Sequence, residues 1–361
     1  MNYKEIIEKQ LNNVIDWEEF EKISRQTKEI SGGLSDQFSL ENILEATLNG
    51  ESFFNNQEAI QGLKELFLYE IKSSLVLCIE ILIICIVIGL LKNIGSSFGN
   101  TSLADISMLV CTMVIIGISI NSFRITYNLA LDSLSTMVST MEIISPVLLG
   151  ILIATGSITS GTILSPVILG SVTGFGIILK KIILPALFTA TILGLINCLT
   201  EKDYVNKLSK LIRNAAVIAT GLILAILSGI ISVQGLITET SDGLLINTAK
   251  YSLSTFIPIV GGFTSDTVEL FIKCMGSIKS VVGVFGILTL IMLILVPLLK
   301  IIIVAVIYKL TAAVTEPISE RKISDGLNEM GSCLISVASV IFFAALLFII
   351  FITTIVKIGG A

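Results

Sequence analysis

The run IISPVLLGILIATGSITSGTILSPVILGSVTGFGIIL, residues 143–179, contains no charged side chain and lies between Glu142 and Lys180. A single helix over this run would be about 55 Å long, whereas the hydrocarbon core of a bilayer is about 30 Å thick. The run therefore has to break within its length, and the position of the break decides how many segments the chain places in a membrane.

The same run contains an internal repeat. SPVLLG, which begins at Ser145, recurs as SPVILG, which begins at Ser165, and GSITSG between them has the composition of a turn. Serine followed by proline is a favoured start of a helix, so we expect two short helices beginning at the two Ser-Pro pairs. They form either a re-entrant or broken pair buried in protein or two slightly short ordinary spans. In the first arrangement Pro146, Gly156 and Pro166 are candidate hinge or pore-lining residues.

The composition is that of an integral membrane protein. Hydrophobic residues make up 53% of the 361 residues, charged residues make up 14%, and the mean hydropathy is +0.94. Soluble domains contain roughly 25% charged residues. We therefore expect an all-α, polytopic helical bundle in contact with the lipid bilayer.

Several classes of function are excluded by residues that are missing. Histidine is absent, which excludes a Ser-His-Asp triad and histidine-ligated zinc or haem. The net charge of −5 argues against a nucleic-acid partner. There is no phosphate-binding glycine loop, and the acidic residues show no metal-binding spacing. We expect a non-enzymatic protein without a catalytic residue, cofactor or metal.

The charge is unevenly distributed along the chain. Residues 1–72 contain 14 acidic and 7 basic side chains, a net charge of −7, while residues 73–361 carry +2. Apolar residues recur at helical spacing in the first part, which predicts an acidic, polar, amphipathic-helical region followed by a membrane domain. No apolar signal-like segment precedes Lys72.

Apolar runs long enough to cross a bilayer occur throughout the second part. They predict about 6–8 membrane segments, with the run at 143–179 as the broken or re-entrant pair. Lys and Arg counts leave the orientation of the chain open. The expected spans are 73–91, 103–123, 143–179, 182–199, 215–237, 281–307 and 332–356.

Two ionisable residues lie inside apolar runs, Glu80 in the first span and Lys300 in the span at 281–307. Such residues are costly in a membrane and often functional, so a Glu80–Lys300 pair or an ion relay at Glu80 is one interpretation. The other is that Lys300 extends to the membrane surface and Glu80 faces a polar seam between helices.

Small residues form two stripes with a spacing of four. Such stripes let helix backbones approach closely, so the two spans are candidates for packing together or for contact in a homo-oligomer. The stripes are Ala186, Ala190 and Gly194 in one span, and Gly221, Ala225 and Gly229 in the next.

The stretch between residues 238 and 280 is too polar to span a membrane but is patterned. It predicts an amphipathic helix ending near Phe256, followed by Pro258 and the pair Gly261-Gly262. The glycines with the following Thr-Ser-Asp form either a turn that caps the next helix or flexible backbone lining a pathway, with Asp266 as a polar contact. Pro258, the two glycines, Asp266 and Pro297 join the candidate pore or hinge residues.

The C-terminal half resembles the stage III sporulation protein AE family. The resemblance covers most of residues 60–335, is densest over 242–317, and extends upstream to the prolines around Gly156. The residues that carry it are Asp242-Gly243, Lys250, Phe256, Pro258, Gly261-Gly262, Ser265-Asp266, Lys279, Gly283, Gly286, Pro297 and Glu316-Pro317.

The resemblance implies a permease-like or channel-like membrane subunit of the apparatus that joins mother cell and forespore during endospore formation. It implies other stage III sporulation proteins as partners and a location in the mother-cell membrane around the forespore. The residues also fit an autonomous secondary transporter with discontinuous helices. A third reading is a structural platform that recruits partners through residues 1–72.

Overall fold

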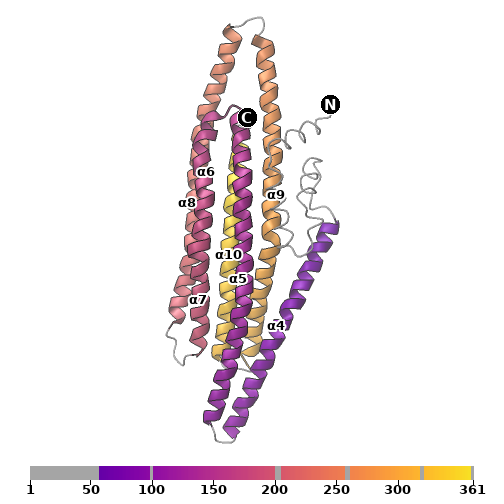
Figure 1. Cartoon of the computed structure of the whole chain (residues 1–361), viewed down its shortest axis with the longest axis vertical. Coiled ribbons are helices and arrows are strands. Elements are labelled where there is room, and N and C mark those ends of the chain that lie inside the picture. Colours follow the sequence, from indigo (N-terminus) through magenta and orange to yellow (C-terminus); the bar gives the residue numbers. More distant parts are fainter. Residues whose placement is uncertain (1–56, 98–100, 200–204, 257–260, 318–320, 359–361) are drawn as a thin grey trace.

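The computed structural model describes residues 57–97, 101–199, 205–256, 261–317 and 321–358, and these residues form helices joined by short connections without any β-strand (Figure 1). Two short irregular helices, the π-helix Leu179–Ile183 and the 3₁₀ helix Asn197–Leu199, interrupt the regular pattern. The α-helices are α4 (Gln57–Ser97), α5 (Thr101–Ala154), α6 (Ile158–Ile178), α7 (Leu184–Ile196), α8 (Asn206–Phe256), α9 (Gly261–Thr315) and α10 (Arg321–Lys357).

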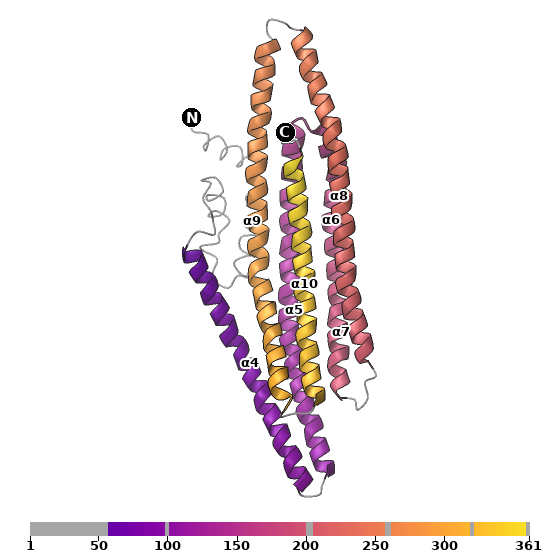
Figure 2. The same ribbon diagram turned by 180° about the vertical axis from the view of Figure 1, so that it is seen from behind.

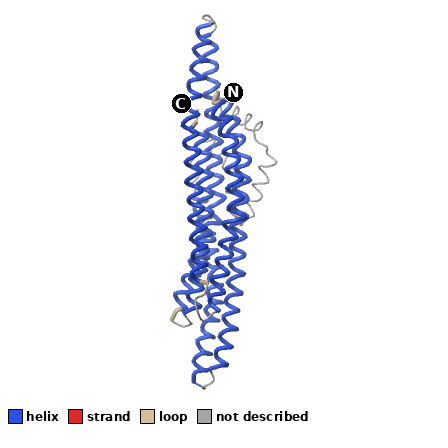
Figure 3. Tube along the Cα trace, turned by 90° about the vertical axis from the view of Figure 1, so that its left-hand side faces the viewer, coloured by secondary structure: helices blue, strands red, loops and turns tan. Residues whose placement is uncertain are grey.

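The helices run up and down along one long axis. Helices α5, α9 and α10 occupy the centre, α6, α7 and α8 lie on one side of them, and α4 lies on the other (Figures 1 and 2). The hairpin of α4 and α5 extends past one end of the bundle, and the hairpin of α8 and α9 extends past the other, as the side view in Figure 3 also shows.

Six stretches of helix are long and apolar enough to cross a membrane among the described residues. The prediction of an all-α membrane bundle with about 6–8 segments is therefore confirmed. The six stretches are Phe67–Leu90, Leu109–Ala154, Ile158–Ile196, Asn206–Gly235, Met275–Thr315 and Arg321–Lys357.

The uncharged run at 143–179 breaks at Gly156. This residue has φ of 91°, a left-handed backbone conformation that glycine adopts without steric penalty. The amide of Gly156 donates to the carbonyl of Ile153 at 3.0 Å and thereby closes the end of α5. The predicted turn between the two halves of the run is therefore present.

The prediction that helices begin at the two Ser-Pro pairs is wrong. Pro146 lies inside α5 and Pro166 lies inside α6, and both helices continue through the proline. Proline removes one backbone hydrogen bond, and in membrane helices packing against neighbours compensates for this loss. The two halves of the run are consequently parts of long helices rather than a pair of short ones.

The polar stretch after the fourth apolar run is also helical. Helix α8 ends at Phe256, as predicted, but it is continuous from Asn206. The expected turn at Gly261-Gly262 is wrong, because α9 begins at Gly261. Pro258 and residues 1–56, most of the predicted acidic region, lie outside the described residues.

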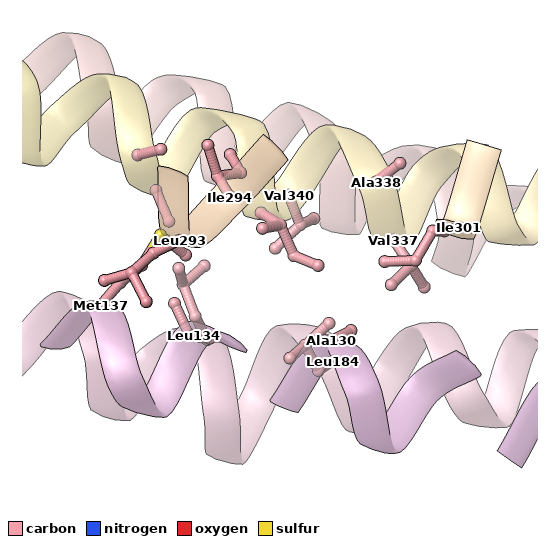
Figure 4. Packing of buried hydrophobic residues seen from close by; sticks show 14 of the residues in the cluster. Ala130, Leu134, Met137, Leu184, Leu293, Ile294, Ile301, Val337, Ala338 and Val340 are labelled. Carbon is pink, nitrogen blue, oxygen red and sulfur yellow. The ribbon is translucent and has the colours of Figure 1, made fainter. Parts of the chain in front are cut away.

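The core lies between α5, α9 and α10. Leu134 and Met137 of α5 point toward Leu293 of α9 and Val340 of α10 in Figure 4, and all four side chains are at most 1% exposed. At Gly331 of α10 a Cβ atom would lie 2.8 Å from a backbone oxygen of α9, so the two backbones approach closely at that point.

Hydroxyl side chains occur on the buried side of α5 at intervals of seven residues. Three of them, Thr126, Ser133 and Thr140, donate to the carbonyl four residues earlier at distances of 2.6–3.0 Å. Because these three hydroxyls are satisfied within their own helix, they can be buried among apolar neighbours. The row consists of Thr112, Ser119, Thr126, Ser133 and Thr140.

Candidate functional site

The opposite side of α5 carries charged and amide side chains that are exposed. They recur at intervals of three, four or seven residues, which places them on one face of the helix. We call this set the charged face of α5. It consists of Asn121, Arg124, Asn128, Asp132, Ser139 and Glu142.

Two contacts on the buried side of α5 show which part of α9 lies at the same depth along the bundle as this face. A Cβ atom on Gly286 of α9 would lie 3.3 Å from the side chain of Ile144, and the Tyr308 ring of α9 lies beside Ser119. The segment of α9 between Gly286 and Tyr308 contains one charged residue, Lys300. The charged face of α5 therefore lies at the depth of one of the most apolar segments in the chain.

The neighbouring helix adds polar groups to the same region. The hydroxyl of Thr173 on α6 donates to the Glu142 carboxylate at 3.3 Å. Lys180 and Lys181 follow in the π-helix Leu179–Ile183, and Lys180 is within electrostatic range of Glu142. Because an inserted π-helical turn shifts the side chains beyond it around the helix, such turns are frequent at functional sites.

Contact between these charges and hydrocarbon would be unfavourable. Charged residues at the centre of a membrane helix cost about 3 kcal/mol each on insertion scales, so they normally face protein or water. Arg124, Asp132 and Glu142 are three charges on a single exposed face of the candidate span Leu109–Ala154. The face is chemically suited to contact a second polar protein surface or a water-filled passage.

A partly buried ion pair joins α8 to α10 elsewhere in the bundle. Arg213 donates a hydrogen bond to the Glu329 carboxylate, and Ser209 lies 3.4 Å from the same carboxylate oxygen. The Ser209 hydroxyl also donates to the carbonyl of Ala190 at 2.8 Å, which links α7 to the pair. Within the described residues there is no cluster of three acidic or cysteine side chains that could hold a metal ion.

Comparison with known proteins identifies the family of this chain. The family model for stage III sporulation protein AE matches residues 38–359. The chain belongs to the stage III sporulation protein AE family. It is 29% identical over 332 residues to stage III sporulation protein AE of Bacillus subtilis (strain 168), an alignment that covers 91% of this chain and 82% of the relative. No solved structure matches. The resemblance to this family predicted from the sequence is confirmed.

The predicted hinge and pore residues of this family member are spread over several helices. Pro166 is exposed on α6, whereas Pro297 is buried inside α9, which passes through it without a break. Pro146 lines an apolar hollow of about 360 Å³ between the C-terminal part of α5 and α9, together with Gly150 and Met275. Their role as pore or hinge residues stays a prediction.

The two glycines predicted in a turn and the following acidic residue lie at the start of α9. Gly261 and Gly262 are in its first turn and Asp266 is in its second. Glu80 is on the exposed side of α4, and Lys300 is half-buried on α9. An ion pair between Glu80 and Lys300 also stays a prediction.

The first small-residue stripe lies where three helices meet. A Cβ atom on Gly194 would lie 3.0 Å from Glu329 of α10 and 3.3 Å from Ser209 of α8. Ala190 is likewise buried, and Ala186 is half-buried. Small side chains at these positions let α7 approach α8 and α10 closely.

The second stripe does not lie at this junction of α7, α8 and α10. Gly221 is beside Phe343 of α10, where a Cβ atom would lie 3.9 Å from the ring, and no atom lies within 4 Å of the corresponding position at Gly229. Ala225 and Gly229 are exposed, which leaves them accessible to lipid or another protein.

Sequence reasoning missed the charged face of α5 and the Arg213–Glu329 pair. The span expected at 103–123 ends before Arg124, whereas α5 continues through Arg124 to Ala154. The three-to-four spacing of polar residues between Asn121 and Glu142 is a signal that could have revealed the face.

Proposed function

We propose that this chain is a non-enzymatic, permease-like subunit of a trans-envelope channel or export complex required for endospore formation. Family membership supports a sporulation protein, and the six apolar helices support a protein of the membrane. The proposed location is the mother-cell membrane around the forespore, and the proposed partners are other stage III sporulation proteins.

The charged face of α5 is the observation that carries the proposal. Its exposed charges lie at the same depth as the apolar segment of α9, where a monomer in lipid would place them against hydrocarbon. A partner subunit or a water-filled passage removes that cost. The face also carries both signs of charge and hydroxyl and amide groups, which suits contact with water and polar solutes.

Leucine substitutions on this face test whether it contacts water or a polar partner, as proposed, or contacts lipid. Asp132→Leu and Glu142→Leu remove charge, so they are neutral or stabilising if the face contacts lipid and harmful if it contacts water or a polar partner. We expect fewer heat-resistant spores in a Bacillus subtilis strain in which this chain replaces the resident family member, with normal accumulation of the variants in membranes. Ile125→Leu, on the same exposed side of α5, is the matched control.

Cysteine accessibility tests the aqueous contact directly. Ser139→Cys should react with a charged, water-soluble thiol reagent above the level of the natural cysteines, whereas Leu222→Cys on the exposed apolar side of α8 should not. Normal sporulation of both leucine variants, together with an unreactive Ser139→Cys, would contradict the proposal. That result would leave the family membership unaffected and would reject a polar passage or polar partner at α5.

A further inference from the structure

A polar pocket of about 140 Å³ lies at the end of the bundle where α7 ends and where α8 and α10 begin. It is distinct from the charged face of α5, because its lining comes from α7, α8, α10 and the 3₁₀ helix. Its lining includes Asn197, Asn206, Lys210, Lys322, Asp325 and Glu329.

The pocket has an excess of positive charge. Glu329 is paired with Arg213, so its negative charge is already compensated. Asp325 is then the remaining acidic group among the lining side chains named above, against the two ammonium groups of Lys210 and Lys322. Helices α8 and α10 both begin at this end, and the positive ends of their dipoles add to the attraction for an anion.

Exposed apolar side chains lie within two residues of the lining residues in the sequence. Ile196 and Leu199, on either side of Asn197, have 44% and 37% of their surface exposed, and Leu208 and Leu211, on either side of Lys210, have 49% and 64% exposed. A cationic, amide-lined pocket beside an apolar surface is complementary to an amphiphile that carries a phosphate. A free phosphate or nucleotide would use the pocket but not these apolar side chains.

We propose that the pocket binds the phosphate of a phospholipid headgroup. Lys210 and Lys322 donate to the phosphate oxygens, while Asn197 and Asn206 contact the headgroup. The acyl chains lie along the exposed apolar side of α8. Basic pockets between membrane helices are a common means of lipid headgroup recognition. A phosphate–glycerol group is small enough for a pocket of this volume.

The test uses the full-length chain purified in detergent, with phosphatidylglycerol added and bound lipid measured by native mass spectrometry. Lys210→Gln/Lys322→Gln should weaken binding by at least about tenfold, because a charge-assisted hydrogen bond contributes on the order of tenfold or more. Lys207→Gln/Arg321→Gln is the matched control, since it removes the same charge from exposed residues that do not line the pocket. This control should bind as the unaltered chain does.

Asp325→Asn gives an independent test, because removing a negative charge from the lining should strengthen phosphatidylglycerol binding. Circular dichroism of each variant establishes that it is folded. Equal weakening by the two double variants, or no change in Lys210→Gln/Lys322→Gln, would overturn the proposal, as would weaker or unchanged binding in Asp325→Asn. Displacement of the lipid by millimolar inorganic phosphate would assign the pocket to a soluble phosphate and overturn the lipid assignment.

Discussion

Arg213 of α8 and Glu329 of α10 form an ion pair across 116 positions of sequence, and their side chains are 14% and 13% exposed. Ser209 contacts the same carboxylate and donates to a backbone carbonyl of α7. Helices α7, α8 and α10 are therefore joined by one polar cluster. Its position beside the polar pocket means that the pair both connects helices and sets the charge at that end of the bundle.

Replacing one partner of this ion pair should destabilise the protein more than replacing both. Arg213→Met leaves the Glu329 carboxylate partly buried without its partner, and a loss of about 2 kcal/mol in the free energy of unfolding is expected. Arg213→Met/Glu329→Leu should recover most of that loss, because no uncompensated charge remains. Thermal unfolding in detergent measures both variants. If the double variant is no more stable than Arg213→Met, the pair does not act as a compensated unit.

Two glycines on α6 should respond differently to the same change. A Cβ atom at Gly176 would lie 2.7 Å from Val138 of α5, whereas none of the neighbouring atoms is within 4 Å of that position at Gly174. Gly176→Ala should lower the stability by about 1–3 kcal/mol through overpacking. Gly174→Ala should be neutral or slightly stabilising, because alanine favours helix. Melting temperatures in one detergent provide the comparison, and equal melting temperatures would contradict the packing of α5 against α6.

The turn between α5 and α6 should depend on glycine at position 156. Gly156→Ala places a Cβ atom on a residue with φ of 91°, which costs about 1–2 kcal/mol. Gly150→Ala, inside α5 and without a neighbouring atom within 4 Å, is the control and should be tolerated. Protease cleavage at the turn should increase in Gly156→Ala alone. Equal cleavage in the two variants would show that the left-handed conformation is not required.

The Lys279 side chain should stabilise the C-terminal end of α10. Its side chain is 1% exposed, and its ammonium group donates to the carbonyl of Ile358, directly after the last residue of the helix. Lys279→Met removes this donor and should lower the stability by about 1.5–3 kcal/mol, with faster hydrogen exchange in the last turn of α10. Lys357→Met, at an exposed position in the same turn, should leave the exchange unchanged. Matching exchange rates in the two variants would argue against this role for Lys279.

Composition and hydropathy alone predict correctly that the chain is an all-α membrane protein. Its low charge and long apolar runs allow few alternatives, because backbone groups in lipid must form hydrogen bonds within their own segment. The break near Gly156 followed from the length of the uncharged run, and the end of α8 at Phe256 followed from local pattern. These are properties of short stretches or of bulk composition, so they can be read without knowing the neighbours.

Packing between the helices sets which helices are continuous and which side chains are in contact. Pro146 and Pro166 locally favour helix starts, but packing against neighbouring helices lets α5 and α6 pass through them. Arg213 and Glu329 each look like the end of a separate span, and only the parallel course of α8 and α10 brings them together. The exposure of Arg124, Asp132 and Glu142 likewise depends on which face of α5 the other helices cover. Such contacts join residues far apart in sequence, so they cannot be predicted from the composition of either local stretch.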